Sequence, residues 1–373
     1  MKHKGDVMRN IRVGLAFKDF ACWLRSSCVG LNVAGFATAQ VLNEAGIDTT
    51  VFPVRHNVDL VHAIDKYKEE NGVPLTHVVI SAPWLSVHDL KQLLYHFPYI
   101  DFTVLSHSNV GFLQADFEGV RNIRGYIELA ECFTNLTVGG NSERYVEWLR
   151  ESFHSDAVLL PNLYPLDRDV MKPPVDTFRW SPRPIPVLKI GAFGAVRPQK
   201  NFMTAAAAAV LINRQLDIPV EFHMSTGGEE DGNLTALAIE QMLENSGVTL
   251  VRHPWRYWDD FIKEVGAMDL LIQVSYTESF NMITADGINA GVPSVVSPAI
   301  SWAPCHWRAD PDDACDVARV GINLLTHAST RAQGIKALRA HNKWALSVWK
   351  DVLCYEEEKQ TLWQTFVKLF KRH

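Results

Sequence analysis

Two carboxylates separated by seven residues are the side chains of this sequence best placed to do chemistry together. Glu278 and Asp286 flank a small polar stretch that follows an apolar run at 269–275. The run is typical of a buried parallel strand, and Ser279 and Asn281 are suitable N-cap residues for a helix after it. A strand end that leads into a helix is the usual ligand position in an open α/β sheet. The paired acids therefore suggest a site, and at first sight acid–base chemistry.

A second polar group follows another expected strand, at 187–191. Its loop contains Gly194 and two cations, Arg197 and Lys200. Taken alone, these charges are best interpreted as an ordinary solvated loop, since most surface charges have no further role. Together with the acidic segment and its strand-helix-strand context, they favour a ligand site.

The first half of the chain offers two weaker candidates, Gly30 and His107. Gly30 lies in a glycine-containing stretch at 28–35 that is neither a P-loop nor a GxGxxG fingerprint. It is explained equally by close approach to a ligand and by close packing of a helix on a strand. His107 follows an expected strand at 102–106, a position that suits a ligand contact as well as a structural role.

Apolar extended runs alternate with helical patterns twice along the chain. This alternation predicts an α/β protein with two doubly wound parallel sheets. We expect an N-terminal domain over residues 1–178 and a C-terminal domain over 179–354. A proline-rich stretch from Pro161 to Pro186 is the expected linker. After about residue 312 the chain is expected to be helical to its end.

Composition bounds the class of protein. A chain of 373 residues favours two domains, and 47% hydrophobic with 21% charged residues is normal for a soluble globular protein. The net charge of -6 neither proposes nor excludes a nucleic-acid partner, because a local basic groove can exist within an acidic total. The six cysteines form no Cys-x-x-Cys pair, and we recognise no signal peptide or membrane span. We therefore expect a cytoplasmic location.

The motif segments resemble retaining GT-B glycosyltransferases of glycosyltransferase family 4. The resemblance is strong over 187–297, where it rests on the loop 194–201 and the acidic segment 278–286, and weak elsewhere, where it includes Pro161-Asn162. It implies two facing Rossmann-like domains with doubly wound parallel sheets, the C-terminal one binding a nucleotide sugar. It also implies that a C-terminal helix, about 355–373, crosses back to complete the first domain.

The resemblance gives the polar groups of the second domain specific roles. Lys200 and Arg197, on the loop that starts at Gly194, would hold the donor diphosphate, whose negative charge grows as the bond to the sugar breaks. Backbone N–H groups of Ser279, Phe280 and Asn281 would point at the same phosphates as a helix N-terminus. Glu278 would accept hydrogen bonds from hydroxyl groups of the donor sugar, and Asp286 would accept them from the ribose. In the first domain, His107 would contact the sugar or the acceptor, and Gly30 would approach the donor or the acceptor. No metal and no separate cofactor are expected.

Two positions depart from the family pattern. Ala195 stands where an arginine is usual, and Asp286 stands where a second glutamate is usual. Our hypothesis is that Arg197 reaches the diphosphate from its shifted position, the alternative being that Lys200 supplies most of the positive charge.

The expected function is transfer of a hexosyl or pentosyl group from a nucleotide sugar to an acceptor hydroxyl, with retention of anomeric configuration. A glycan, a lipid-linked sugar, a small molecule and a hydroxymethylated DNA base all remain open as acceptor. Alternatives are a non-hydrolysing nucleotide-sugar epimerase and a non-catalytic nucleotide-sugar-binding subunit. The basic, apolar segment 362–372 is expected to dock on the first domain, and weak peripheral membrane contact is its other interpretation.

Overall fold

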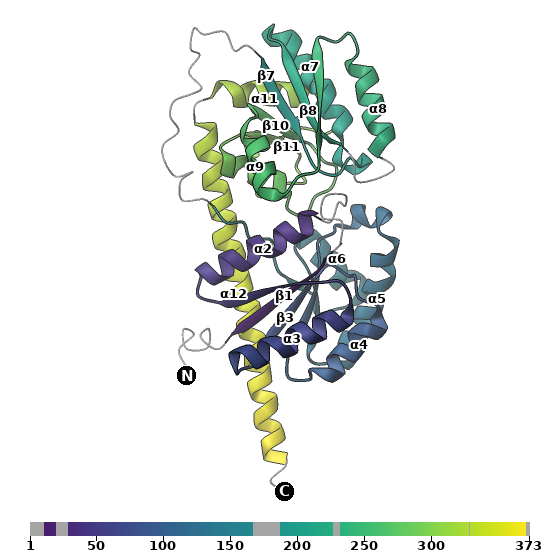
Figure 1. Cartoon of the computed structure of the whole chain (residues 1–373), viewed down its shortest axis with the longest axis vertical. Helices are drawn as coiled ribbons and strands as arrows, with labels where there is room; N and C mark the ends of the chain where they lie inside the picture. Colours follow the sequence, from purple (N-terminus) through teal and green to yellow (C-terminus); the bar gives the residue numbers. More distant parts are fainter. Residues whose placement is uncertain (1–10, 20–28, 167–186, 227–231, 328, 371–373) are drawn as a thin grey trace. The chain divides into compact units, whose positions relative to one another are not determined.

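The structure is a computed structural model that describes residues 11–19, 29–166, 187–226, 232–327 and 329–370, with backbone only from 355 onward. The chain divides into two compact units. The first contains Met1–Phe20, Leu31–Pro165 and Asn342–His373, and the second contains Ala21–Gly30 and Leu166–His341. Each unit is built around one parallel sheet flanked by helices, as predicted (Figure 1).

The first unit has a six-stranded parallel sheet in the order β2-β1-β3-β4-β5-β6. Its strands are β1 Arg12–Lys18, β2 Asp48–Val54, β3 His77–Ser81, β4 Asp101–Ser106, β5 Leu136–Gly140 and β6 Val158–Leu159. The chain builds β2 on one side of β1 and all later strands on the other. The switch point of this sheet is therefore the crevice between β1 and β3, where ligands bind in open α/β sheets.

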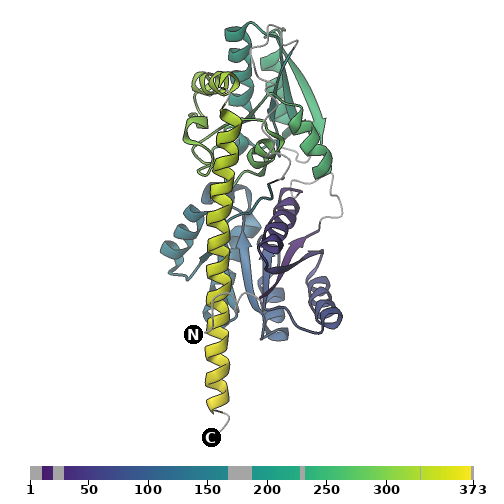
Figure 2. The ribbon, with the colours of Figure 1, turned by 90° about the vertical axis from the view of Figure 1, so that its left-hand side faces the viewer.

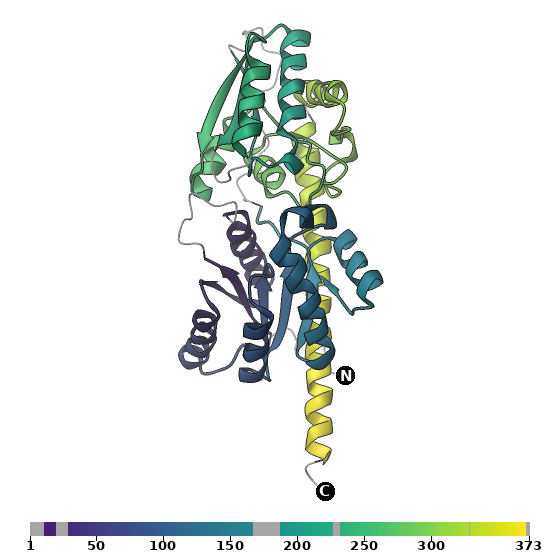
Figure 3. The same ribbon diagram turned by 90° about the vertical axis from the view of Figure 1, so that its right-hand side faces the viewer.

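Helices cover both faces of the first sheet. They are α2 Val29–Glu44, α3 Asn57–Asn71, α4 Val87–His96, α5 Phe117–Cys132, α6 Glu143–Phe153 and α12 Thr330–Phe370. Buried side chains of α3 to α6 share one core with the sheet, and those of α2 and α12 share the core on its other face. Figure 2 shows the side of α2 and α12, and Figure 3 the side of α4 and α5. The connection from β1 to β2 and the later connections run in opposite directions along the sheet. Right-handed crossovers therefore place α2 on one face and α3 to α6 on the other.

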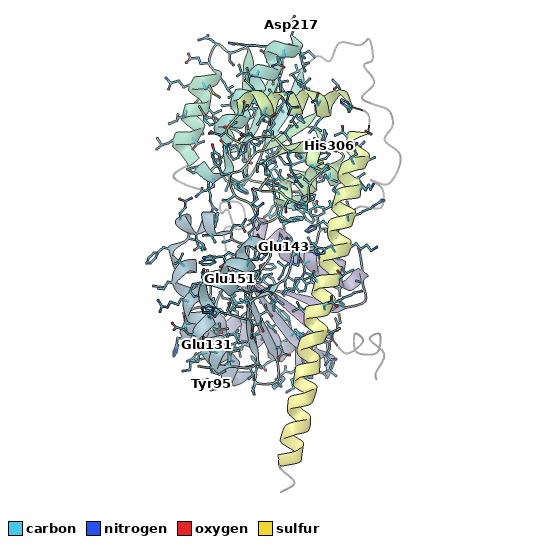
Figure 4. All side chains as sticks on the ribbon, turned by 180° about the vertical axis from the view of Figure 1, so that it is seen from behind. Tyr95, Glu131, Glu143, Glu151, Asp217 and His306 are labelled. Carbon is cyan, nitrogen blue, oxygen red and sulfur yellow. The ribbon has the colours of Figure 1, made fainter. Side chains whose placement is uncertain are left out.

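Apolar periodicity explains how these helices sit on the sheet. In α6 the buried residues are Tyr145, Val146 and Leu149, spaced along one helical face. Glu143 and Glu151, which are labelled in Figure 4, lie exposed on the other face. The helix thus buries its apolar stripe against β5 and β6.

The proline-containing segment 161–165 was predicted as part of a linker, and this prediction is wrong. All five residues are buried, and Leu163 and Tyr164 are completely so. Trp349 of α12 donates from Nε1 to the Pro161 carbonyl at 2.8 Å, and Asn342 exchanges two hydrogen bonds with the Tyr164 backbone. The apolar side chains between the prolines keep this segment in the core.

The C-terminal return to the first unit begins earlier than predicted. Residues from Asn342 onward group with the first unit, whereas the sequence suggested 355. The proposed domain boundary at 178/179 falls outside the described residues, as do the side chains of 362–372, so the docking of that segment stays a prediction. Among the described residues, no helix is long and apolar enough to cross a membrane.

The second unit has a five-stranded parallel sheet in the order β11-β10-β7-β8-β9. Its strands are β7 Leu188–Ala192, β8 Val220–Thr226, β9 Val248–Pro254, β10 Leu270–Gln273 and β11 Ser294–Val296, and its own helices are α7 Phe202–Leu216, α8 Gly232–Leu243, α9 Trp258–Gly266, α10 Met282–Ala290 and α11 Ala314–Thr326. The chain builds β8 and β9 on one side of β7, then β10 and β11 on the other. The switch point lies between β7 and β10.

Candidate functional site

Two loops frame the switch point of the second sheet, one after β7 and one after β10. They are tied together through the backbone, because Tyr276 N–H donates to the Gln199 carbonyl at 2.9 Å. Asn201 adds a side-chain bridge, donating from Nδ2 to the Val274 carbonyl at 3.1 Å. The loop with Gly194, Arg197 and Lys200 is thereby held against the acidic segment, as the sequence suggested.

Lys200 and Glu278 meet across these loops. The Lys200 ammonium lies 2.5 Å from Glu278 Oε1, and the Glu278 side chain is only 8% exposed. The same oxygen accepts hydrogen bonds from Ser275 Oγ and Asn281 Nδ2, both at 2.9 Å. One carboxylate oxygen thus receives three donors, which fixes the position of the acid and holds the cation at the crevice.

Asn281 sets the start of α10. Its backbone is left-handed, with φ 67°, and its side-chain oxygen caps the helix by accepting from Thr284 N–H at 2.8 Å. The helix therefore begins at Met282. The N–H groups of Ser279, Phe280 and Asn281, predicted as the helix N-terminus, belong instead to the turn before it, because a left-handed residue cannot continue a helix.

Phe280 supports this turn with both its ring and its carbonyl. The ring is buried and stacks on Trp302 with centroids 5.0 Å apart. The Trp302 indole also donates to the Phe280 carbonyl at 2.6 Å. Phe280 therefore anchors the turn between Glu278 and Asn281.

Asp286 lies within α10 and is 2% exposed. Its Oδ1 accepts a hydrogen bond from Trp258 Nε1, at the start of α9, at 3.0 Å. A buried carboxylate needs donors, and the indole supplies one from a neighbouring helix. Trp258 was not singled out in the sequence, since it lies 28 residues away and an indole has no characteristic spacing to an acid.

Gly194 gives the first loop its sharp turn. Its φ of +114° is one that side-chain-bearing residues rarely adopt, and a Cβ there would lie 3.0 Å from Ile283 Cδ1 of α10. Its N–H donates to Ser225 Oγ at the end of β8 at 3.1 Å. Arg197 lies half-buried three residues later, at the N-cap of the short 3-10 helix Pro198–Lys200.

Replacing Gly194 with alanine is expected to destabilise the fold by about 1–3 kcal/mol, because it adds backbone strain and a contact with Ile283. The loop must shift to relieve both, which displaces Lys200. Urea denaturation measures the loss. Gly266→Ala is the matched control, since its Cβ would lie 3.6 Å from Ala290 Cβ, an ordinary contact. Equal stability of the two variants would contradict the assignment of strain to Gly194.

In the first unit, His107 follows β4 as predicted and belongs to a polar network. Its Nε2 lies 2.8 Å from Ser81 Oγ, and its Nδ1 lies 3.2 Å from Asn141 Nδ2. Asn141 Nδ2 also donates to Asn162 Oδ1 at 2.9 Å. Burial lowers the pKa of His107 to about 4, so the ring is neutral at physiological pH. Ser81 and Asn141 carried no sequence signal beyond their positions at strand ends.

Gly30 is not in a loop, contrary to the sequence interpretation. It is the second residue of α2, it is exposed, and an added Cβ would meet no atom within 4 Å. Close packing of α2 on the sheet is achieved instead at Gly35, where a Cβ would lie 2.8 Å from Phe17. Packing thus does not explain Gly30, and the residues before it, 20–28, lie outside the described part of the chain.

The second unit therefore presents a lysine, two buried or nearly buried carboxylates and a constrained glycine loop at one sheet edge. This combination suits a ligand that carries both negative charge and hydroxyl groups. In the described segments, no group of three or more His, Cys, Asp or Glu side chains is arranged to hold a metal ion.

Comparisons with known proteins agree on the fold. No protein-family model and no curated protein sequence matches the chain. Among solved structures, a sucrose-phosphate synthase from Thermosynechococcus elongatus is similar with a TM-score of 0.59 and 15% identity, covering 97% of this chain and 100% of that one. HepE from Anabaena, in complex with UDP and glucose, has a TM-score of 0.56 and 13% identity, covering 91% and 97% of the two chains.

TarM from S. aureus, solved with UDP and sugar ligands, has a TM-score of 0.51 and 14% identity. The match covers 74% of this chain and 55% of TarM, so this chain spans about half the length of that structure. These neighbours are GT-B proteins, and the two parallel sheets with interleaved helices match theirs. The GT-B fold implied by the sequence resemblance is confirmed.

Proposed function

We propose that this chain, on its GT-B fold, transfers a sugar from a nucleotide-sugar donor to an acceptor hydroxyl. The observation that carries the proposal is the contact of Lys200 with Glu278 at the switch point of the second sheet, 2.5 Å from Nζ to Oε1. A cation and a hydroxyl-binding carboxylate side by side match the two parts of such a donor, a diphosphate and a sugar.

Binding of the donor exchanges partners at this contact. The diphosphate takes the Lys200 ammonium, and the sugar hydroxyls donate to Glu278 in its place. Ser275 and Asn281 keep Glu278 oriented during this exchange, because their hydrogen bonds to Oε1 do not involve Lys200. Asp286 accepts hydrogen bonds from the ribose hydroxyls, while Trp258 Nε1 continues to donate to Asp286 Oδ1. Arg197 adds positive charge from the same loop as Lys200.

Departure of the nucleotide diphosphate is the step that these groups assist. Negative charge grows on the leaving diphosphate, and a fixed cation in a partly buried site stabilises it more than it stabilises the bound donor. A donor phosphate oxygen can accept the proton of an acceptor hydroxyl that attacks from the same face. The sugar then keeps its anomeric configuration without a protein nucleophile.

The first test is binding and nucleotide release by the purified chain. HepE and TarM were solved with UDP, and HepE with UDP-glucose, so UDP and UDP-glucose are the first ligands, with GDP and ADP as comparisons. A nucleotide at 100 times its dissociation constant raises the unfolding free energy by about 2.7 kcal/mol. We expect such a shift for at least one nucleotide, and release of that nucleotide from its sugar when acceptor is added.

The alternatives give different results in the same experiment. An epimerase converts the donor sugar without acceptor, which product analysis of the nucleotide sugar detects. A non-catalytic binding subunit is stabilised against unfolding by the nucleotide but releases no nucleotide from the nucleotide sugar. No shift with any nucleotide or nucleotide sugar would overturn the proposed function.

A further inference from the structure

A row of neutral polar side chains crosses the carboxyl ends of four adjacent strands in the first unit. Ser81 ends β3, His107 follows β4, Asn141 follows β5 and Asn162 follows β6. Hydrogen bonds of 2.8, 3.2 and 2.9 Å connect them in this order. Ser81, Asn141 and Asn162 are each less than 7% exposed. The row runs from the far edge of the sheet toward its switch point.

The amide orientations of Asn141 and Asn162 assign the proton of the His107 ring to one of its two nitrogens. Asn141 Nδ2 carries two hydrogens and directs one to Asn162 Oδ1 and the other to His107 Nδ1. Because Nδ1 accepts, the proton of the neutral ring lies on Nε2. Nε2 then donates to Ser81 Oγ, which leaves the hydroxyl proton of Ser81 to be donated to another acceptor. Each donor in such a chain strengthens the next.

The end of the row lies where this type of sheet binds ligands. Ser81 pairs in register with Phe17 of β1, so it ends the strand that borders the β1–β3 crevice, whereas His107 follows the next strand, β4. Ala82, the next residue, has φ 72°, an uncommon conformation for a residue with a side chain and one that concentrates at functional sites.

We propose that Ser81 is the residue of the first unit that hydrogen-bonds the substrate, donating to a hydroxyl oxygen of the sugar or acceptor. Asn141 and His107 are positioning residues that hold the Ser81 hydroxyl as a donor. This inference rests on the proposed function for the identity of the substrate. It assigns a neutral, hydroxyl-bearing group to this edge, because Ser81, His107, Asn141 and Asn162 are all uncharged there.

The network itself is tested without substrate. Protein with 15N-labelled histidine is expected to show a protonated Nε2 and an unprotonated Nδ1 for His107 by long-range NMR correlation, with no titration above pH 5.5. His107→Gln assigns the signal. Tyr145 is also neutral in this range, because burial raises its pKa to about 12. An Nδ1-protonated ring would overturn the inference.

Asn141→Asp separates positioning from general structural support. A carboxylate accepts from Nδ1 and favours the protonated ring, so His107 is expected to titrate at or above the ordinary histidine value of about 6.5. The rate of UDP release from UDP-glucose should then depend on pH between 5.5 and 8, unlike that of the unaltered chain. A flat profile in the variant would contradict the coupling of His107 to the substrate.

The substrate contact is tested at Ser81. Ser81→Ala is expected to lower kcat/KM for UDP-glucose by about 10-fold to 100-fold, since a site that hydrogen-bonds a hydroxyl discriminates strongly when the bond is lost. Ser81→Thr keeps the hydroxyl and should restore most activity. Ser294→Ala is the control, a buried serine at the amino end of β11. Unchanged kcat/KM in Ser81→Ala overturns the contact.

The two levels of inference fail differently. A chain that neither binds any nucleotide nor releases one from its nucleotide sugar would overturn the proposed function and, with it, the substrate contact of Ser81. A chain that releases UDP normally in the Ser81→Ala form would overturn only the contact.

Discussion

Replacing Lys200 with alanine should reduce nucleotide-dependent sugar transfer by at least about 10²-fold to 10³-fold, the usual effect of removing one group that stabilises transition-state charge. Lys200 supplies a fixed cation at the switch point of the second sheet, where it lies 2.5 Å from Glu278. The loss should appear mainly in kcat, because the charge on the diphosphate is greatest as the sugar departs. Steady-state release of UDP from UDP-glucose measures it.

The same substitution should also cost stability, by about 2–4 kcal/mol, because it leaves the nearly buried Glu278 carboxylate without its cation. Ser275 and Asn281 still donate to that carboxylate, so the loss of stability is smaller than for a buried charge without any hydrogen-bond donor. Lys200→Met combined with Glu278→Gln removes both charges. If the pair is coupled as the structure indicates, this double variant unfolds at higher urea than Lys200→Met alone.

Glu278→Gln alone separates the two roles of the pair. It removes the carboxylate that competes with phosphate for Lys200, so UDP should bind at least as tightly as before, while transfer of the sugar falls. Titration calorimetry with UDP and the release assay measure the two effects. The matched control is Lys263→Ala, since Lys263 pairs with Asp260 at 2.8 Å on an exposed helix surface and such pairs contribute little. Weaker UDP binding in Glu278→Gln would contradict this mechanism.

The sequence predicted the sheet edges better than the contacts made there. Strand ends and helix starts follow from local patterns, so the strands that precede Lys200 and Glu278 and the helix after Asn281 were predicted from their immediate neighbours. The partner of Asp286 could not be found in this way, because Trp258 reaches it from the start of another helix. Its position depends on how α9 packs on α10, which is a property of the folded unit.

Two errors have a related cause. The segment 161–165 has the proline content of a linker, yet it is buried because Leu163 shares a core with Trp349. Trp349 also donates to the Pro161 carbonyl, 188 positions away in the sequence. Gly30 was placed in a loop because its glycine-containing stretch follows the first strand, and such a stretch does not distinguish a loop from the first turn of α2. In both cases composition indicated which backbone conformations are possible, whereas tertiary packing determined which conformation the segment adopts.

The polar row of the first unit also depends on tertiary packing that local sequence patterns do not predict. His107 was a candidate because a histidine at a strand end suits a ligand contact. Serine and asparagine, the residue types of Ser81 and Asn141, are among the commonest polar residues of turns and therefore did not stand out. Only the parallel register of β3, β4 and β5 brings the three side chains into one line. The sequence therefore identified one member of a chain whose terminal member, Ser81, lies nearer the switch point.

Asn281→Ala should be the most destabilising single change at the site, by about 3–5 kcal/mol. The asparagine caps α10 at 2.8 Å, donates to Glu278 at 2.9 Å, and holds φ at 67°. Loss of the cap costs about 1 kcal/mol, loss of a bond to a carboxylate about 1.5–3, and a left-handed alanine about 1 more. Urea denaturation checks the total.

Two further substitutions resolve this total into its parts. Asn281→Gly should recover about 1 kcal/mol relative to alanine, because glycine adopts φ 67° without strain. Asn281→Asp keeps the cap but places a carboxylate oxygen against Glu278, which raises the pKa of the new acid in the folded state above its unfolded value. Its ionised form therefore destabilises the fold, and the deficit relative to Asn281 should shrink as the pH falls from 8 to 5. A deficit independent of pH would show that Asn281 does not face Glu278 in solution.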